Sequence, residues 1–153
     1  MDDSITAKDI MTTDVVTFKK DVGVKEAAKI FAERHIGGAP VVDEDDRLIG
    51  LISESDLISQ DVKLKFPTFV HLLDSYIFLQ SQRHFEEKLR RAAAAKVGEL
   101  MSEDVYAVTP ETSVEEIATR MVEKQIGRIP VIDTDRRIVG IITKGDIVRT
   151  LAR

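Results

Sequence analysis

The chain contains the same stretch of sequence twice, and this duplication limits what it can fold into. Residues 9–58 and 99–148 align without a gap at an offset of 90, and 17 of the 50 aligned pairs are identical. Most other pairs are apolar in both copies, so the chain is built from a duplicated unit. A unit of about 50 residues is marginally stable alone. We therefore expect the copies to face each other about a pseudo-twofold axis and to bury each other's apolar surfaces.

Each copy has the pattern of a strand, a helix, two strands and a second helix. The first strands are predicted around 15–18 and 105–108. The helices that follow have apolar residues at the i, i+3, i+4 and i+7 spacing of one helix face. These residues are Val24, Ala27, Ala28 and Phe31 in the first copy and Val114, Ile117, Ala118 and Met121 in the second. Residues 113–116 are typical of a capping box, and Gly37 and Gly127 are predicted to end the two helices.

The last part of each copy predicts a β-hairpin followed by a helix. Strands are predicted at 40–43 and 130–133, and acidic turns lead from them into a last strand in each copy. The fold class is therefore α+β, a two-layer arrangement in which two helices cover one face of a small mixed sheet in each repeat. The predicted divisions are a first repeat, a helical insert and a second repeat, at 1–58, 59–95 and 96–153.

The insert is predicted to be helical in both halves. Residues 66–79 are apolar almost all round the helix and therefore need a covering surface. They are expected either to form a partner, dimer or lid surface or to pack on the module itself. The second half, from Ser81 through four alanines, contains strong helix formers. The insert carries six Lys or Arg against four Asp or Glu, so it is basic within an acidic chain.

Composition argues against several classes of protein. The net charge of −5 disfavours a general nucleic-acid binder, which needs a basic face. The absence of cysteine excludes disulfides, thiolate metal sites and a cysteine nucleophile. The acidic N-terminus lacks the apolar run of a signal peptide, and no segment has the roughly 20 apolar residues of a membrane span. We therefore expect a soluble, cytoplasmic protein.

Both copies end on a polar motif in which an aspartate follows a hydroxyl residue by three positions. The motif is Ser53 with Asp56 in the first copy and Thr143 with Asp146 in the second. It lies where a buried strand is predicted to pass into a helix, whose first amides have no partner within the helix. Those amides and the positive end of the helix dipole suit a phosphate. The two oxygens of Asp146 can accept hydrogen bonds from a ribose diol, and Gly145 leaves the approach open.

A second interpretation of this motif is structural. Ser53 with Asp56, and Thr143 with Asp146, also fit a helix N-terminal cap in which both side chains only satisfy backbone amides. Taken alone, the residues favour the cap. The duplicated context and a family resemblance favour ribose binding, and Thr143 can serve in both roles.

Three segments in both copies resemble the cystathionine β-synthase (CBS) domain. They are a Met-Thr or Met-Ser turn followed by Asp-Val, a Gly-x-x-Pro-Val-(Val/Ile)-Asp segment, and a Gly-hydrophobic-Ile-(Ser/Thr)-x-x-Asp ending. Because they cover about 100 of the 153 residues, the whole chain resembles a stand-alone tandem CBS pair, or Bateman module. The resemblance implies a regulatory module, not an enzyme, that binds an adenosine-containing ligand between the copies and signals to an effector protein. It also implies a disc-shaped homodimer.

The resemblance further implies the ligand and its surroundings. AMP, ADP or ATP is expected, with S-adenosylmethionine or NAD as further candidates and no required cofactor or metal. In the second copy the base is expected among Ile126, Ile129, Pro130 and Val131, with its edge read by the backbone from Ala107 to Thr109. The matching residues of the first copy are Thr17, Ala39, Pro40, Ser53 and Asp56.

The two copies differ in charge around the motif. The second copy offers Arg128, Lys144 and Arg149, whereas the first has Gly38 and Glu54 at the positions of Arg128 and Lys144. A phosphate chain prefers the cationic set, so the second cleft is the predicted phosphate site. The first cleft is expected to be empty or to hold a less negative ligand. The alternative for Arg128 and Lys144 is ordinary solvated surface charge.

Three rival functions differ in class. The first is an interaction module that has lost its ligand and only dimerises or acts as a scaffold. The second is an enzyme acting on nucleotides, which the lack of a nucleophile motif or paired acids disfavours. His35, His71 and His84 also lack the spacing of metal ligands. The third is single-stranded nucleic-acid binding by the basic residues 83–91, which would weaken steeply with salt.

Overall fold

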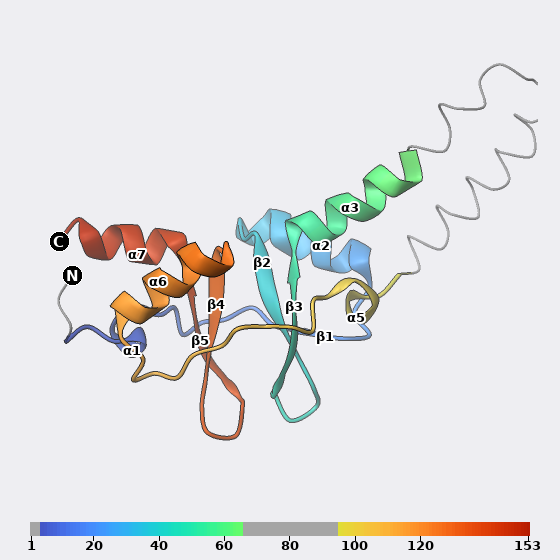
Figure 1. Cartoon of the computed structure of the whole chain (residues 1–153). Helices are drawn as coiled ribbons and strands as arrows, with labels where there is room; N and C mark the ends of the chain where they lie inside the picture. The colour runs from blue at the N-terminus through green and yellow to red at the C-terminus, as the bar shows by residue number, and fades with distance from the viewer. Residues whose placement is uncertain (1–3, 66–94) are drawn as a thin grey trace, which may run out of the picture.

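The computed structural model describes residues 4–65 and 95–153, drawn as ribbons in Figure 1. The first repeat contains α1 (Ala7–Ile10), β1 (Phe18–Lys19), α2 (Val24–Arg34), β2 (Gly38–Val42), β3 (Leu48–Ser53) and α3 (Glu54–Lys65). The second contains α5 (Val97–Leu100), α6 (Val114–Lys124), β4 (Arg128–Ile132), β5 (Ile138–Thr143) and α7 (Lys144–Leu151). The predicted α+β class, with two similar repeats, is confirmed. The insert helices predicted within 66–94 lie outside the described residues.

An antiparallel hairpin forms the centre of each repeat, and the two hairpins stand side by side with their turns at the same end (Figure 1). In the first, β2 pairs with β3 from Gly38 opposite Ser53 to Val42 opposite Leu48, and β4 pairs with β5 in the equivalent register. Burial alternates along β3, as expected of a strand with one face on the core. Helices α2, α3, α6 and α7 gather at the end opposite the hairpin turns.

The first strand of each repeat is shorter than predicted. β1 begins only at Phe18, where it pairs in parallel with β2. In the second repeat, Val108 forms just an isolated parallel bridge with Val131. The preceding residues leave their own sheet because they pair with the other repeat. Thr12, for example, exchanges two backbone hydrogen bonds of 3.0 Å with Ile141 in β5.

Helices α2 and α6 end two residues earlier than predicted. Gly37 and Gly127 were expected to stop them, but the left-handed residues are His35 and Gln125, each with φ of 53°. The amide of His35 bonds to the carbonyl of Phe31, so the helix is closed before the glycine is reached. The two glycines therefore have no role in ending the helices.

The buried faces of these helices follow most of the predicted pattern. Phe31 and Ala27 are buried in α2, but Ala28 is exposed. In α6 the hydroxyl of Ser113 accepts a hydrogen bond of 3.2 Å from the amide of Glu116, so the predicted cap is present. Helix α3 continues to Lys65, past the end expected for the first repeat at residue 58. No helix within the two described ranges is both long and apolar enough to cross a membrane.

Contacts between the repeats occur in equivalent pairs, and these pairs establish the pseudo-twofold axis. Thr6 forms an isolated antiparallel bridge with Ser113. The residues 90 positions away, Lys96 and Gly23, form another with the roles of the repeats exchanged. In the same way, residue 12 of the first repeat pairs with β5, and residue 102 of the second repeat pairs with β3. The predicted facing arrangement of the two copies is therefore what the structure shows.

Each repeat completes the core of the other. Ala7 of α1 lies in the core cluster of the second repeat, and Val97 of α5 lies in that of the first. The methionines beyond these helices pack on glycines of the opposite last strand. A Cβ atom built on Gly140 would lie 2.4 Å from the sulfur of Met11. The equivalent contact joins residues 50 and 101, so neither repeat has a complete core alone.

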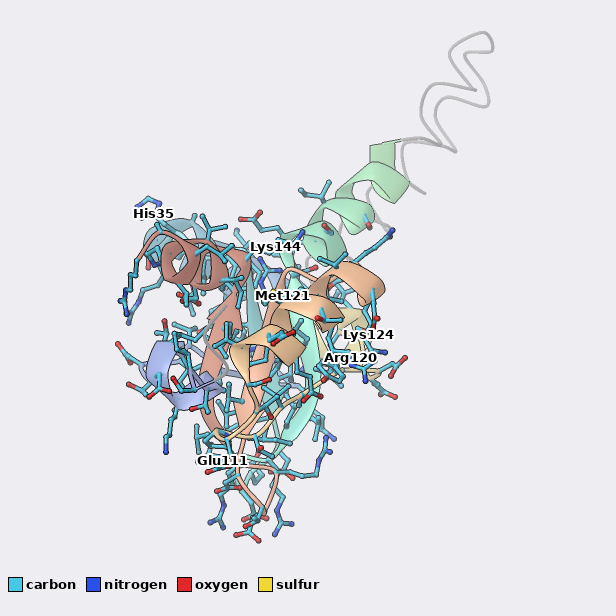
Figure 2. All side chains as sticks on the ribbon, turned by 60° about the vertical axis from the view of Figure 1, so that its left-hand side comes forward. His35, Glu111, Arg120, Met121, Lys124 and Lys144 are labelled. Carbon is cyan, nitrogen blue, oxygen red and sulfur yellow. The ribbon has the colours of Figure 1, made fainter. Side chains whose placement is uncertain are left out.

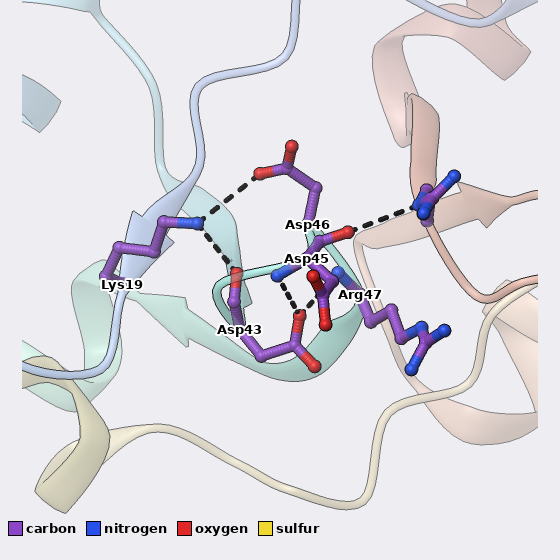
Figure 3. A network of polar contacts seen from close by, with 6 residues as sticks. Lys19, Asp43, Asp45, Asp46 and Arg47 are labelled. Atoms are coloured by element: carbon purple, nitrogen blue, oxygen red, sulfur yellow. Dashed lines mark hydrogen bonds and ion pairs between the residues drawn. The ribbon is translucent and has the colours of Figure 1, made fainter.

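Polar contacts join the two hairpins at their turns (Figure 3). The Nζ of Lys19 donates to the carbonyl of Asp43 at 2.7 Å. One carboxylate oxygen of Asp43 accepts from the amides of Asp45 at 2.9 Å and Arg47 at 3.0 Å. The backbone bond from Arg47, helped by that from Asp45, lowers the pKa of Asp43 from its usual value. Arg137 reaches across from the second hairpin and donates to the carbonyl of Asp45 at 3.3 Å.

Candidate functional site

A cavity of about 240 Å³ opens between the two repeats. The first repeat contributes Thr12, Asp14, Val15, Val16, His35, Ile36, Gly37 and Gly38 to its lining, and the second contributes Arg128, Ile141 and Thr143. The volume is just below the roughly 300–1,000 Å³ of typical ligand pockets. Apolar side chains and glycines make up much of the wall, with a few polar groups among them. This combination is typical of small-molecule sites.

Thr143 brings the junction of β5 and α7 to the cavity. Its amide and its hydroxyl donate to one carboxylate oxygen of Asp146, at 2.7 and 3.0 Å. Asp146 is 7% exposed, and its second oxygen accepts from Nη2 of Arg149. The capping geometry predicted as the structural alternative is therefore present. Thr143 faces the cavity, whereas Asp146 is not part of its lining.

The first repeat has the same junction with one difference. The amide and hydroxyl of Ser53 donate to one oxygen of Asp56, at 2.8 and 3.0 Å. Ser59 stands where the second repeat has Arg149, and its hydroxyl bonds to the carbonyl of Ser55 at 2.8 Å. Within residues 4–59 and 95–153, the second oxygen of Asp56 receives no hydrogen bond.

Arg128 extends from the second repeat over the backbone of the first. A Cβ atom on Gly38 would lie 2.7 Å from Cδ of Arg128, and one on Gly37 would lie 2.6 Å from its Nη2. The glycines therefore make room for this side chain. A Cβ atom on Gly37 would also lie 3.6 Å from the carboxyl carbon of Glu54, so a carboxylate is near the guanidinium. Arg128 is half-buried in the cavity wall, so it is not an ordinary solvated surface charge.

Lys144 is exposed and lies outside the cavity lining. Its nearest glycine contact is with Gly127, where a Cβ atom would lie 3.7 Å from Cε. Figure 2 shows Lys144 and His35 at the same end of the molecule, with Glu111 at the other. Lys144 is therefore placed to attract an anion toward this end without contacting the cavity floor.

Several predicted site residues have side chains that are enclosed in the core. Ile129, Val131, Pro130, Pro40 and Ala39 are almost completely buried. They lie in β2 and β4, which are covered on both faces, so consecutive positions are buried. The side chains of Ile129 and Val131, expected beside the base, are thus enclosed in the core.

The wall opposite Thr143 also differs from the expected one. Ala107 and Thr109 do not line the cavity, and neither does Thr17. Residues 14–16 of the first repeat stand there instead, because the pairing of residue 12 with β5 carries them across. The identities Asp14/Asp104, Ile36/Ile126 and Gly37/Gly127 in the aligned copies were the signal for these missed positions.

No group of three or more His, Cys, Asp or Glu side chains in the described part of the chain is arranged to hold a metal ion. The cavity instead offers hydrogen bonds, one half-buried guanidinium, the carboxylate of Asp14, the imidazole of His35, a helix start and apolar contact. These elements recognise a small molecule with an apolar ring and an anionic or hydroxyl-bearing part.

Comparison with known proteins gives consistent matches. The CBS domain family model matches residues 7–63 and 97–153. The uncharacterized protein MJ1426 of Methanocaldococcus jannaschii is 31% identical over 151 residues, which cover 94% of this chain and 89% of that protein. The crystal structure of CBSX2, an Arabidopsis thaliana protein, in complex with AMP superposes with a TM-score of 0.74 at 26% identity and covers 96% of both chains.

A second solved structure holds other adenosine compounds. It is the CBS domain pair of protein MJ0100 in complex with 5′-methylthioadenosine and S-adenosyl-L-methionine. Its TM-score is 0.70 at 26% identity, and the match covers 97% of this chain and 96% of that one.

Proposed function

Because the chain belongs to the CBS domain family and carries two such domains, we propose that it is a regulatory module, not an enzyme, that binds an adenosine-containing ligand between its repeats. The observation that carries this proposal is the cavity, which takes one wall from each repeat and has Thr143 and Arg128 in its lining. Similar CBS pairs hold AMP, or methylthioadenosine and S-adenosylmethionine. The ligand class is thus supported by both the site and the relatives.

We place the base against the apolar part of the cavity, formed by Val15, Val16, Ile36 and Ile141. Backbone groups of 14–16 are available to read its edge, as main-chain groups do in small-molecule sites. The ribose and phosphate then lie toward Thr143, at the start of α7, where the positive end of the helix dipole favours an anion.

The charges favour a phosphorylated ligand, with AMP, ADP or ATP as the candidates. Arg128 is a planar donor suited to phosphate oxygens. A sulfonium such as that of S-adenosylmethionine would place a positive charge beside this guanidinium, which costs free energy. NAD brings a second nucleoside, for which the cavity of about 240 Å³ offers little enclosed space.

The output of such a module is a change in how its repeats or subunits sit together. A ligand shifts that balance only by its different affinity for the two states. We propose that a homodimer transmits the change to an effector protein. Apolar side chains left exposed on helices of the described chain support this assembly, namely Val148 and Leu151 at 63% exposure each and Ile58 at 59%.

A thermal-shift panel tests the proposal. AMP, ADP, ATP, S-adenosylmethionine and NAD are compared with guanosine monophosphate and ribose 5-phosphate. A ligand present at 100 times its Kd adds about 2.7 kcal/mol, which is a rise of about 5–10 °C for a chain of this size. Arg128→Ala should reduce the rise, while Arg120→Ala, the same change at an i,i+3 surface pair on α6, should not.

The negative result is equally clear. If no adenosine compound raises the melting temperature, the ligand proposal fails and the dimerising scaffold is the better account. An equal response to ribose 5-phosphate would also contradict the proposal, because the base would then contribute nothing.

A further inference from the structure

The two junctions between last strand and last helix differ in one contact. In both, the hydroxyl and amide of the first motif residue bond to a single oxygen of the aspartate. The other oxygen of Asp146 is bonded by Arg149, whereas that of Asp56 has no hydrogen bond from residues 4–59 or 95–153. A ribose diol needs this second oxygen as an acceptor. The aspartate of the second repeat is therefore not open to a diol as it stands.

Sequence differences at two positions explain the contact. The second repeat has Gly145 and Arg149 where the first has Ser55 and Ser59. A Cβ atom on Gly145 would lie 3.3 Å from Nη1 of Arg149, so the glycine lets the guanidinium fold back on the first turn of α7. Ser59 is too short to reach Asp56 and bonds to the carbonyl of its own helix instead. Glycine and arginine thus act as a matched pair.

The position of Arg149 also brings a cation close to Thr143. A Cβ atom on Gly145 would lie 3.6 Å from the hydroxyl of Thr143, which lines the cavity. The side chain of Arg149 is 70% exposed, so one side of the guanidinium remains in solvent. Because the carboxylate of Asp146 is buried, Arg149 leaves it at little cost only when another donor takes its place.

We propose that Arg149 makes the second cleft selective for phosphorylated ligands, an inference that rests on the proposed adenosine site. Without ligand, Arg149 occupies the oxygen of Asp146 that a diol needs. A ligand with a phosphate draws the guanidinium to itself and frees that oxygen for the ribose. An unphosphorylated nucleoside has to displace Arg149 without compensation. In the first cleft, Ser59 at the position of Arg149 does not compete for Asp56, so this cleft accepts uncharged adenosine compounds more readily.

The test is a titration of the full chain with adenosine and with AMP, followed by amide NMR. The amide of Thr143 reports the second cleft and that of Ser53 reports the first, so each Kd is assigned to its own site. Arg149→Ser introduces the residue of the first repeat. At the second cleft, adenosine should bind up to about fivefold more tightly because the competing pair is gone. AMP should bind about tenfold more weakly because a charge-assisted hydrogen bond is lost.

Three further variants sharpen the result. Arg149→Lys retains the positive charge and should keep most of the preference for AMP. Ser59→Arg combined with Ser55→Gly should give the first cleft a preference for AMP over adenosine. Arg120→Ser makes the same substitution at the exposed pair on α6 and should change neither Kd.

Two outcomes overturn the inference in different ways. If both ligands bind the parent chain and Arg149→Ser leaves the ratio of their Kd values unchanged at the second cleft, the selectivity role is wrong and the adenosine site stands. If neither ligand shifts either amide in the parent chain, the adenosine site falls and this inference falls with it.

Discussion

Placing a methyl group on Gly140 should destabilise the whole chain, because this glycine receives a methionine from the other repeat. The added Cβ atom would lie 2.4 Å from Sδ and 2.8 Å from Cγ of Met11. Ordinary carbon contacts are about 3.5–4.0 Å, so the methionine or the strand has to move by roughly 1 Å. Overpacking of this kind costs about 1–3 kcal/mol.

An opposing term reduces the net effect. Gly140 has no positive φ, so alanine suits its backbone and restricts the unfolded chain, which stabilises by about 0.4–1 kcal/mol. We therefore expect Gly140→Ala to lower the free energy of unfolding by about 1–2 kcal/mol. In urea, with a slope of about 1–3 kcal/mol per molar, the midpoint should fall by roughly 0.5–1 M.

The pseudo-twofold axis supplies a second variant and a control. Gly50→Ala should cost a similar amount, since its Cβ atom would lie 2.5 Å from the sulfur of Met101. Gly23→Ala is the control, because nothing lies within 4 Å of its added atom. Combining Gly140→Ala with Met11→Ala should cost at least about 1 kcal/mol less than the sum of the single changes. Equal midpoints for the variants of Gly140 and Gly23 would refute the interlocked packing of the repeats.

Two other predictions concern the hairpin turn and the cleft. Asp43→Asn should make the free energy of unfolding depend less on pH in acid. The pKa of Asp43 is lowered in the folded state, so its ionised form stabilises the fold. This stabilisation is complete above about pH 4 and is lost as the pH falls through the pKa of the folded state. Urea midpoints between about pH 2 and 5 check this, and Asp45→Asn, which keeps both hydrogen bonds to Asp43, should retain the steep limb. Gly38→Ala should displace Arg128 and weaken AMP binding by about tenfold in calorimetry, with little effect on stability because a flexible side chain gives way. Undiminished AMP affinity would show that Arg128 does not contact the phosphate.

Features that depend on local pattern were predictable from sequence. The identities between the copies and the i, i+3, i+4, i+7 spacing gave the repeats and the helices α2 and α6, because periodicity reports which face is buried. The hairpins followed from apolar runs separated by acidic turns. The helix ends were missed, since a left-handed residue need not be glycine, and His35 and Gln125 adopt that conformation here.

The cleft was predictable only in part, because it depends on contacts between distant segments. Thr143 and Arg128 were expected in the site and line the cavity. Residues 14–16 of the first repeat, which share the cavity lining with them, were not expected there, since the pairing of Thr12 with Ile141 leaves no local signal in the sequence. The bond between Arg149 and Asp146 was missed for a related reason: an arginine three residues after an aspartate on a helix is common and predicts no particular partner.

The most direct test of the central claim is an amide NMR titration of the chain with AMP. The account predicts that the amides of Gly37, Gly38 and Thr143, which line the cavity from both repeats, shift together with one saturation curve. The amide of Glu111, at the opposite end of the molecule in Figure 2, should not move. Saturable shifts confined to one repeat, or none at millimolar AMP, would contradict a nucleotide site built between the two.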